Sequence, residues 1–334
     1  MTVVSSRRAL LKSAPLAAAG AFVASGMGSE LLAATPAKAV QDDTLITYFQ
    51  VPMQKRWPIN QGLVSSKSYG KYFKKDLVAP RAMVDLLETG PLPREFILEP
   101  TVEGLATLMA EWPKAPLSGY ALVESGPCAY AQSRHVFPGV TAKMFQWWFT
   151  WHPIESERYM LWFPYAHIHN SVADPQRLSD TSKTYGERLY GNPNHIIEYI
   201  GGLYLDGIIS FDEPASFGLD PNEVARQGFT FNASGIISPF DAKDTPLVLM
   251  IHLGRDTPAG LEMINRYWIG THPSWDRFAK FPGGAAKSKA IIEKMGMDKT
   301  ALENFAYEMA LHDMTEFHCL GSFLADIYHE NHRG

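Results

Sequence analysis

The chain contains only two cysteines, Cys128 and Cys319, among its 334 residues. Two thiols cannot make a disulfide framework or a zinc site built from thiolates. Positive charge is not in excess either, since 30 Lys and Arg stand against 35 Asp and Glu, for a net charge of −5. Binding to nucleic acid needs a concentrated basic face, so we expect no nucleic-acid partner.

Long apolar runs and internal repeats are also missing. Beyond the N-terminal segment, no stretch approaches the 18 or more apolar residues of a membrane span, so we expect none in the mature chain. No unit recurs with a period of 20 to 50 residues, which argues against a solenoid or a propeller. The content of 46% hydrophobic and 12% aromatic residues is typical of a folded soluble protein with a sizeable core.

The N-terminus carries features of an export signal. The pair Arg7-Arg8, a mildly apolar stretch over residues 13–34 and the small residues of Ala37-Lys38-Ala39 follow one another in the order of a twin-arginine signal peptide. We therefore predict that residues 1–39 are removed and that the mature protein is periplasmic or secreted. The alternative is an amphipathic N-terminal helix.

The rest of the chain divides by composition into two parts. Residues 40–115 hold short elements punctuated by prolines, which indicates an N-terminal arm or small subdomain, and residues 116–334 form the main domain. A helix is expected over 140–151, and β-branched and aromatic residues predict strands over 157–163, 195–211, 229–237 and 246–254. One long helix is expected over 298–330. Strands first and one long helix last predict an α+β fold, a curved antiparallel sheet closed by a C-terminal helix.

The predicted C-terminal helix has two polar residues on its packing face. His312 and Glu316 lie one turn apart, so their side chains can converge on one point. The stripe that they share is otherwise apolar: Leu302, Phe305, Met309, Leu320, Phe323 and Ile327. A buried carboxylate without a partner is costly, and a divalent metal relieves that cost. The alternatives are a simple His–Glu hydrogen bond or a helix turned the other way.

Further polar residues lie on the apolar faces of predicted strands. Glu198 alternates with Ile196 and Ile200, His252 shares a face with Val248 and Met250, and His167 follows a run of aromatic residues. A single buried histidine is more often an ordinary core residue than a ligand. Together with His312 and Glu316, these residues favour a mixed His/Glu metal centre that suits zinc, with iron or manganese as other candidates.

Common catalytic motifs are missing. The sequence has no His-Glu-x-x-His zinc motif and no Gly-x-Ser-x-Gly elbow. It also lacks a glycine-rich phosphate loop and a dinucleotide fingerprint. The pair His167-Ile168-His169 has the spacing of a cupin motif, but no glutamate follows three or four residues later.

Five short motifs, in matching order and spacing, resemble the diacetylphloroglucinol hydrolase family. They are Arg158-Tyr159 with Trp162, Pro164 and His167, then His195-Ile196-Ile197-Glu198, His252-Leu253-Gly254-Arg255-Asp256, Arg266-Tyr267-Trp268-Ile269-Gly270 and His312-x-x-x-Glu316. The resemblance implies hydrolysis of a carbon–carbon bond that removes acetate from an acylated phloroglucinol. It also implies a helix-grip fold similar to Bet v 1 and START domains, one Zn²⁺ or another divalent metal per chain, and a homodimer to which the N-terminal region contributes.

The resemblance also assigns roles to individual residues. By position, it gives the metal four ligands: His167, Glu198, His312 and Glu316. It lines the substrate cavity with three further residues as candidate catalytic groups: His252, Tyr159 and Tyr267. The sequence departs from the family pattern around Trp162-Phe163, where a further histidine is expected before His167.

These features lead to the hypothesis of a metal-dependent hydrolase that acts on a small aromatic acyl substrate. His252 or Tyr159 is the candidate group that protonates the ring carbon. The aromatic residues that could wall the pocket are Trp147, Trp148, Trp151, Trp162 and Phe163. The rival hypothesis is a secreted helix-grip protein that binds aromatic or lipid ligands and holds a structural metal, and a third is an iron-dependent oxygenase.

Overall fold

The computed structural model describes residues 44–46 and 49–332. The predicted signal peptide, residues 1–39, lies outside these described residues. Residues Asp42–Gly334 form one compact unit. A search of the described helices finds none with the length and apolar character needed to span a membrane.

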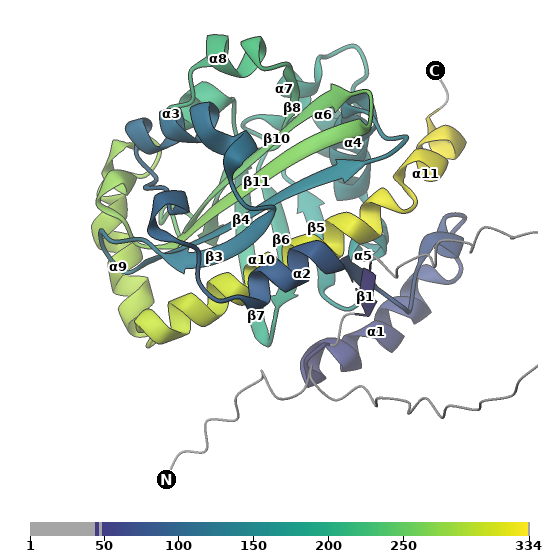
Figure 1. The fold of residues 1–334 in the computed structure, drawn as a ribbon. Coiled ribbons are helices and arrows are strands. Elements are labelled where there is room, and N and C mark those ends of the chain that lie inside the picture. Colours follow the sequence, from purple (N-terminus) through teal and green to yellow (C-terminus); the bar gives the residue numbers. More distant parts are fainter. Residues whose placement is uncertain (1–43, 47–48, 333–334) are drawn as a thin grey trace, which may run out of the picture. The chain divides into compact units, whose positions relative to one another are not determined.

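The centre of the fold is an antiparallel sheet of nine strands (Figure 1). Its strand order is β3-β4-β11-β10-β9-β7-β6-β5, and β8 pairs with β10 beside β9. The strands are β3 Ser118–Leu122, β4 Cys128–Phe137, β5 His167–Val172, β6 Asn194–Ile200, β7 Leu203–Phe211, β8 Phe229–Asn232, β9 Gly235–Pro239, β10 Val248–Thr257 and β11 Gly260–Gly270. The observed class is therefore α+β, as the sequence predicts.

The expected strand region 195–211 is a hairpin of two strands. Ile200 pairs with Leu203, so the turn consists of Gly201 and Gly202. Gly201 adopts a φ of +58°, a left-handed conformation that glycine reaches without steric cost. The turn gives β6 and β7 opposite directions while keeping Glu198 on the inward face of β6.

Helices surround the sheet and connect its strands. Those after β4 are α4 Ala142–Trp151, α5 Ser156–Trp162, α6 Pro175–Ser179, α7 Tyr185–Leu189, α8 Pro221–Arg226, α9 Gly284–Lys294, α10 Lys299–Gly321 and α11 Leu324–Asn331. The expected helix over 140–151 is confirmed as α4. The expected single helix over 298–330 is interrupted at Ser322–Phe323, between α10 and α11.

The prediction of a strand over 157–163 was wrong, because this segment forms helix α5. Its residues Glu157, Arg158, Met160 and Leu161 are good helix formers, and the aromatic residues between them produced the strand pattern. The helix ends at Trp162, two residues before Pro164, since the residue that precedes a proline disfavours the helical conformation. The helix brings Tyr159 and His167 close together.

Helix α10 lies across the inner face of the sheet and packs against β4 and β3 (Figure 1). Alternation along β11 separates two hydrophobic clusters. Met263, Tyr267 and Ile269 belong to the inner cluster with α10, whereas Ile264 and Trp268 belong to the outer cluster. The outer cluster is covered by α3 Val102–Glu111.

The N-terminal segment packs into the inner cluster and does not form a separate unit. It comprises β1 Thr44–Ile46, α1 Val51–Val64, β2 Val78–Pro80 and α2 Arg81–Glu88. Ala79, Met83 and Leu87 share the inner cluster with α10. Helix α10 is thus covered by the sheet on one side and by β2 and α2 on another.

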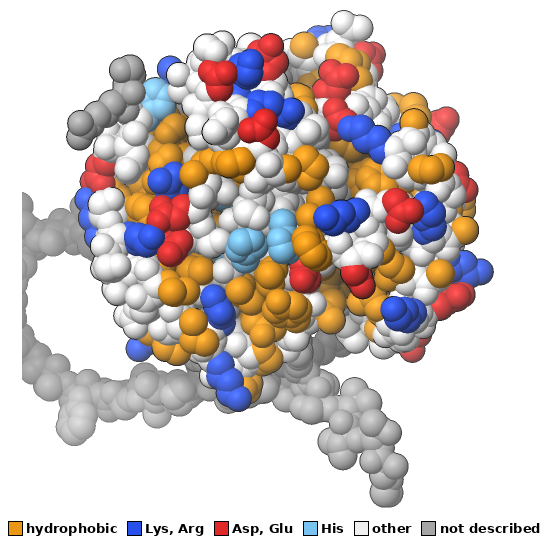
Figure 2. Space-filling view, turned by 180° about the vertical axis from the view of Figure 1, so that it is seen from behind, with side chains coloured by type: hydrophobic (Ala, Val, Ile, Leu, Met, Phe, Trp, Pro, Cys, Tyr) orange, Lys and Arg blue, Asp and Glu red, His pale blue; other side chains and the backbone are white. Residues whose placement is uncertain are grey.

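The surface carries charges of both signs. On the face in Figure 2, acidic and basic side chains are interspersed, and apolar side chains gather in patches between them. Exposed large apolar residues include Val51, Ile59 and Leu63, all on α1.

Candidate metal centre and cavity

The four predicted metal ligands converge from three elements. His312 and Glu316 lie one turn apart on α10, His167 begins β5, and Glu198 lies on β6 directly opposite His167 in the sheet register. A shift in register between His167 and His169 separates these two histidines, so that His167 is fully buried and His169 is only half-buried. The His-x-His spacing of the sequence therefore does not produce a pair of ligands.

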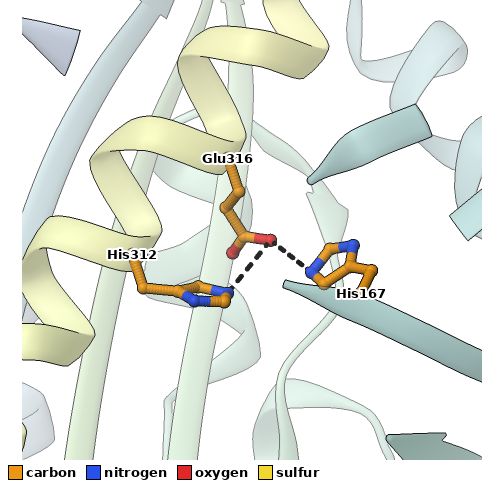
Figure 3. A group of neighbouring side chains, drawn as sticks. All are labelled: His167, His312 and Glu316. Carbon is orange, nitrogen blue, oxygen red and sulfur yellow. Dashed lines mark ion pairs between the residues drawn. The ribbon is translucent and has the colours of Figure 1, made fainter. Parts of the chain in front are cut away.

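The side-chain ends of the four residues meet in a buried space. Figure 3 shows three of them, His167, His312 and Glu316. His167 Nε2 lies 3.3 Å from Oε2 of both Glu198 and Glu316. His312 Nε2 lies 3.4 Å from Glu198 Oε2 and 3.7 Å from Glu316 Oε2. His167, His312 and Glu316 each offer an atom within 4.8 Å of the others, close enough to share one ion.

The proton on His167 decides what this group can hold. His167 Nδ1 lies 2.9 Å from the Tyr159 carbonyl oxygen. A carbonyl only accepts, so Nδ1 carries the hydrogen and Nε2 of the neutral ring presents a lone pair. Among the described residues this Nε2 has no hydrogen-bond partner, although two carboxylate oxygens face it. Lone pairs that converge in this way need a shared proton or a cation between them.

The two carboxylates cannot both keep ordinary acidities in this space. Burial and the nearby charges of Glu198 and Asp313 raise the pKa of Glu316 well above its usual value. Burial also disfavours the charge on Glu198, but the imidazoles of His167 and His312 that face this carboxyl outweigh burial and lower its pKa. Burial lowers the pKa of His167, which favours the neutral ring that metals bind. Two imidazoles and two carboxylates therefore fit a divalent ion such as zinc.

A cavity adjoins the cluster. Glu198, His312 and Glu316 line it together with apolar side chains from the sheet and helices. The apolar lining includes Phe149, Trp162, Ile196, Phe211, Met250 and Met309. Polar groups at one side of an apolar cavity are typical of a small-molecule site.

Of the predicted aromatic walls, only Trp162 lines this cavity. Trp147 and Trp151 stack on each other with ring centroids 4.9 Å apart, and Trp148 is completely buried in the core. The helical period of α4 instead turns Phe149 toward the cavity, because the residues of its inner face recur every three to four positions.

Tyr159 lines the cavity beside the cluster. Its ring stacks on that of His167 with centroids 3.6 Å apart, and its hydroxyl donates to Glu198 Oε2 over 3.1 Å. Burial, followed by the charges of Glu198 and Glu316, raises the pKa of Tyr159 well above its usual value. The hydroxyl therefore keeps its proton, which is directed at Glu198.

His252 and Tyr267 line the cavity on neighbouring strands and bond to each other. His252 Nε2 lies 3.0 Å from the Tyr267 hydroxyl, and that hydroxyl donates to Asp313 Oδ1 over 2.6 Å. Burial lowers the pKa of His252 to about 4, so its ring is neutral at neutral pH. All seven predicted site residues thus lie in or beside one cavity.

The sequence analysis missed several polar residues of this region. Asp313 is completely buried, because its carboxylate meets side chains of strands β4 and β11 on the inner face of the sheet. Asn170 and His152 line the cavity, and the Oδ1 atom of Asn170 has no partner among the described residues. His152 follows the Trp-rich helix, where an aromatic run conceals a single polar position.

Comparison with known proteins relates the whole region to one family. The family described as DAPG hydrolase PhiG domain matches residues 98–329. The chain is 44% identical to a 2,4-diacetylphloroglucinol hydrolase from Pseudomonas sp over 287 residues, which cover 86% of this chain and 96% of that protein. A protein of the same name from Pseudomonas protegens is also 44% identical, with 92% of its length covered.

A more distant relative has a different name. The chain is 25% identical to a phloretin hydrolase from Eubacterium ramulus over 205 residues, which cover 61% of this chain and 72% of that protein. The solved structure of Ara h 8.0201 aligns with 54% of the chain at 11% identity, with a TM-score of 0.27. Since the family match and the 44% identical relatives cover most of the chain and include every predicted site residue, the chain belongs to the 2,4-diacetylphloroglucinol hydrolase family.

Proposed function

We propose that this protein is a metal-dependent hydrolase that cleaves the bond between the acyl carbon and the ring carbon of a C-acylated polyhydroxyphenol. The products would be a short carboxylic acid and the deacylated phenol. Support comes from relatives named for hydrolysis of 2,4-diacetylphloroglucinol and of phloretin. The observation that carries the proposal is the lone pair of His167 aimed at two carboxylates on the rim of an apolar cavity.

The residues that would hold the metal are His167, Glu198, His312 and Glu316. A bound divalent ion, with zinc the first candidate and iron or manganese next, supplies an activated water and polarises the acyl carbonyl. The chain's own residues then have three tasks: to bind the ring, to exclude bulk water and to deliver a proton to the ring carbon.

The proposed reaction consumes water and the acylated phenol and needs no other reactant. The oxygen of water bonds to the acyl carbon, the bond from the acyl carbon to the ring carbon breaks, and the ring carbon takes a proton. A polyhydroxylated ring can bear the electron pair left on its carbon, because its keto form delocalises the charge. The candidate groups for protonation are His252 and Tyr159, which both line the cavity.

The apolar walls serve to orient the ring. Phe149, Trp162 and Phe211 offer flat surfaces, and Tyr159 and Tyr267 offer hydroxyl oxygens beside them. A cavity of this kind binds an aromatic ring by burial and selects its orientation by a few polar contacts. We propose a small aromatic acyl compound as the substrate on these grounds.

The alternative, a binding protein with a structural metal, predicts the same cavity but no reaction. Membership of a hydrolase family favours the enzyme. The deciding experiment incubates the purified mature protein with a panel of C-acylated phenols and measures carboxylic acid release with and without a chelator. Tight binding of aromatic ligands without release of acid would support the carrier. An oxygenase would instead require redox-active iron in elemental analysis.

Export and assembly are further proposals. We propose that residues 1–39 direct twin-arginine export and that the mature protein acts outside the cytoplasm. Replacing Arg7 and Arg8 by lysine should keep an uncleaved form in the cytoplasm, which fractionation and N-terminal sequencing would detect. We also propose a homodimer with contacts from α1, whose apolar residues Val51, Ile59 and Leu63 are exposed; sedimentation of the mature protein tests it.

A further inference from the structure

A second buried acid lies next to the candidate metal centre. Asp313 follows His312 on α10, and its side chain is completely buried. Tyr267 and Asn265 both donate to its Oδ1, over 2.6 and 2.7 Å. His135 Nε2 lies 2.9 Å from its Oδ2. Three donors therefore surround one carboxylate.

These donors come from the middle of the sheet. His135 lies on β4, and Asn265 and Tyr267 lie on the adjacent strand β11. The pairing of Asn265 with Ser133 places their side chains on the same part of the inner face. His135 Nε2 also lies 2.9 Å from Ser133 Oγ. Asp313 thus joins α10 to two central strands through polar contacts.

The direction of each hydrogen bond follows from what each group can donate. A carboxylate only accepts, so the single hydroxyl hydrogen of Tyr267 is directed at Asp313. The Tyr267 oxygen can then only accept from His252 Nε2, which lies 3.0 Å away. His252 must therefore carry its hydrogen on Nε2, which leaves a lone pair on Nδ1. That Nδ1 has no partner among the described residues.

We propose that Asp313 is a positioning residue that fixes the hydroxyl hydrogen of Tyr267 and, through it, the tautomer of His252. The proposal rests on the proposed function only in that His252 and Tyr267 line the reaction cavity. With its hydrogen held by Asp313, Tyr267 meets the substrate as an acceptor and binds a ring hydroxyl rather than a carbonyl. Without the charge of Asp313, the hydroxyl can rotate and His252 can exchange tautomers.

The first test does not depend on catalysis. Nitrogen-15 NMR of histidine-labelled protein separates the two neutral tautomers by the shifts of Nδ1 and Nε2. The chain has 11 histidines, so the signal of His252 is assigned by its loss in His252→Gln. The Nε2–H tautomer is expected in the wild type, and a mixture is expected in Asp313→Asn and in Tyr267→Phe. A wild type with the hydrogen on Nδ1 overturns the proposal, as does an unchanged tautomer in both variants.

The second test measures whether Asp313 acts through Tyr267. Asp313→Asn and Tyr267→Phe should each lower kcat about 100-fold, within the range for positioned proton-handling groups, with a much smaller change in KM and full metal content. The double variant should be no slower than the slower single variant, because both changes remove the same contact. Multiplied losses in the double variant would mean that Asp313 has only a structural role.

A matched control variant distinguishes loss of the Asp313–Tyr267 contact from a general destabilisation of the core. Ser288 is a completely buried hydroxyl on α9 that donates to Thr271 Oγ1, outside the cavity. Ser288→Ala should leave kcat unchanged, and its effect on stability should add to that of Asp313→Asn. If Asp313→Asn does not fold, Tyr267→Phe and the wild-type tautomer still decide the proposal. If no acylated phenol is cleaved, the proposed function fails while the tautomer test still decides the role of Asp313.

Discussion

Two polar groups lie side by side on the same turns of α10, one around Asp313 and one around Glu316, and they differ in how well their hydrogen-bonding groups are satisfied. Around Asp313, three donors meet one carboxylate, so donors and acceptors match within the protein. Around Glu316, two carboxylates face a histidine lone pair, so acceptors face acceptors. Both groups are buried, and burial makes such a mismatch expensive. The Asp313 carboxylate is satisfied without a ligand, whereas the second group needs a shared proton or a cation.

The largest expected effect is a difference in metal content and rate between variants of the two histidines of β5, His167 and His169. His167→Ala should abolish metal binding and reduce hydrolysis to background, because it removes a proposed ligand. His169→Ala, two residues away on the half-exposed side, should keep both the metal and the rate. Elemental analysis of the purified variants, together with acid release from an acylated phenol, measures the contrast. Equal metal content in both variants would rule out this ligand assignment.

The next effect concerns groups inside the cavity but outside the ligand set. His252→Ala should retain the metal and lose about 10²- to 10⁴-fold in rate, the usual range for a positioned acid or base. Tyr159→Phe should lose less, since its ring still stacks on His167 and only the hydroxyl is removed. Steady-state kinetics of metal-loaded variants tests the order. A His252→Ala variant that changes only ligand affinity would favour the carrier.

Replacement of Glu316 and replacement of Asp313 should change the stability of the metal-free protein in opposite directions. Glu316 has a raised pKa, so near pH 7 folding must either protonate it or bury its charge. Glu316→Gln should therefore stabilise the metal-free protein, because the amide is neutral at every pH. Asp313→Asn should destabilise it by about 1–3 kcal/mol, because the amide cannot accept from all three donors. Urea unfolding after chelation measures both, and the same sign for both variants would contradict the comparison.

The smallest effect is a dependence of stability on pH. Burial lowers the pKa of His252 to about 4 and that of His152 to about 3. An unfolded histidine titrates near 6.5, so the unfolded state binds more protons below this value. The stability contributed by the neutral rings is thus complete above about pH 6.5 and decreases as the pH falls toward 4. Thermal unfolding of wild type and His152→Phe should show a smaller decrease in the variant.

The sequence was sufficient for the parts of the protein that repeat a local pattern. The period of α4, the alternation that turns Glu198 and His252 inward, and the spacing of His312 and Glu316 all follow from backbone geometry. The family resemblance assigned Glu198, His252, His312 and Glu316 to one site from the sequence alone. The local pattern gave a wrong prediction over 157–163, where the aromatic residues indicated a strand but the segment forms helix α5.

Only the tertiary structure decided which polar groups satisfy one another. The register shift in β5 separates His167 from His169, and neither residue's identity predicts it. Asp313 is buried because it faces His135 on β4 and Asn265 and Tyr267 on β11. Its partners His135 and Asn265 come from strands far away in the chain. Hydrogen-bond balance depends on where long-range contacts bring donors and acceptors, and a sequence pattern records which groups exist but not which ones meet.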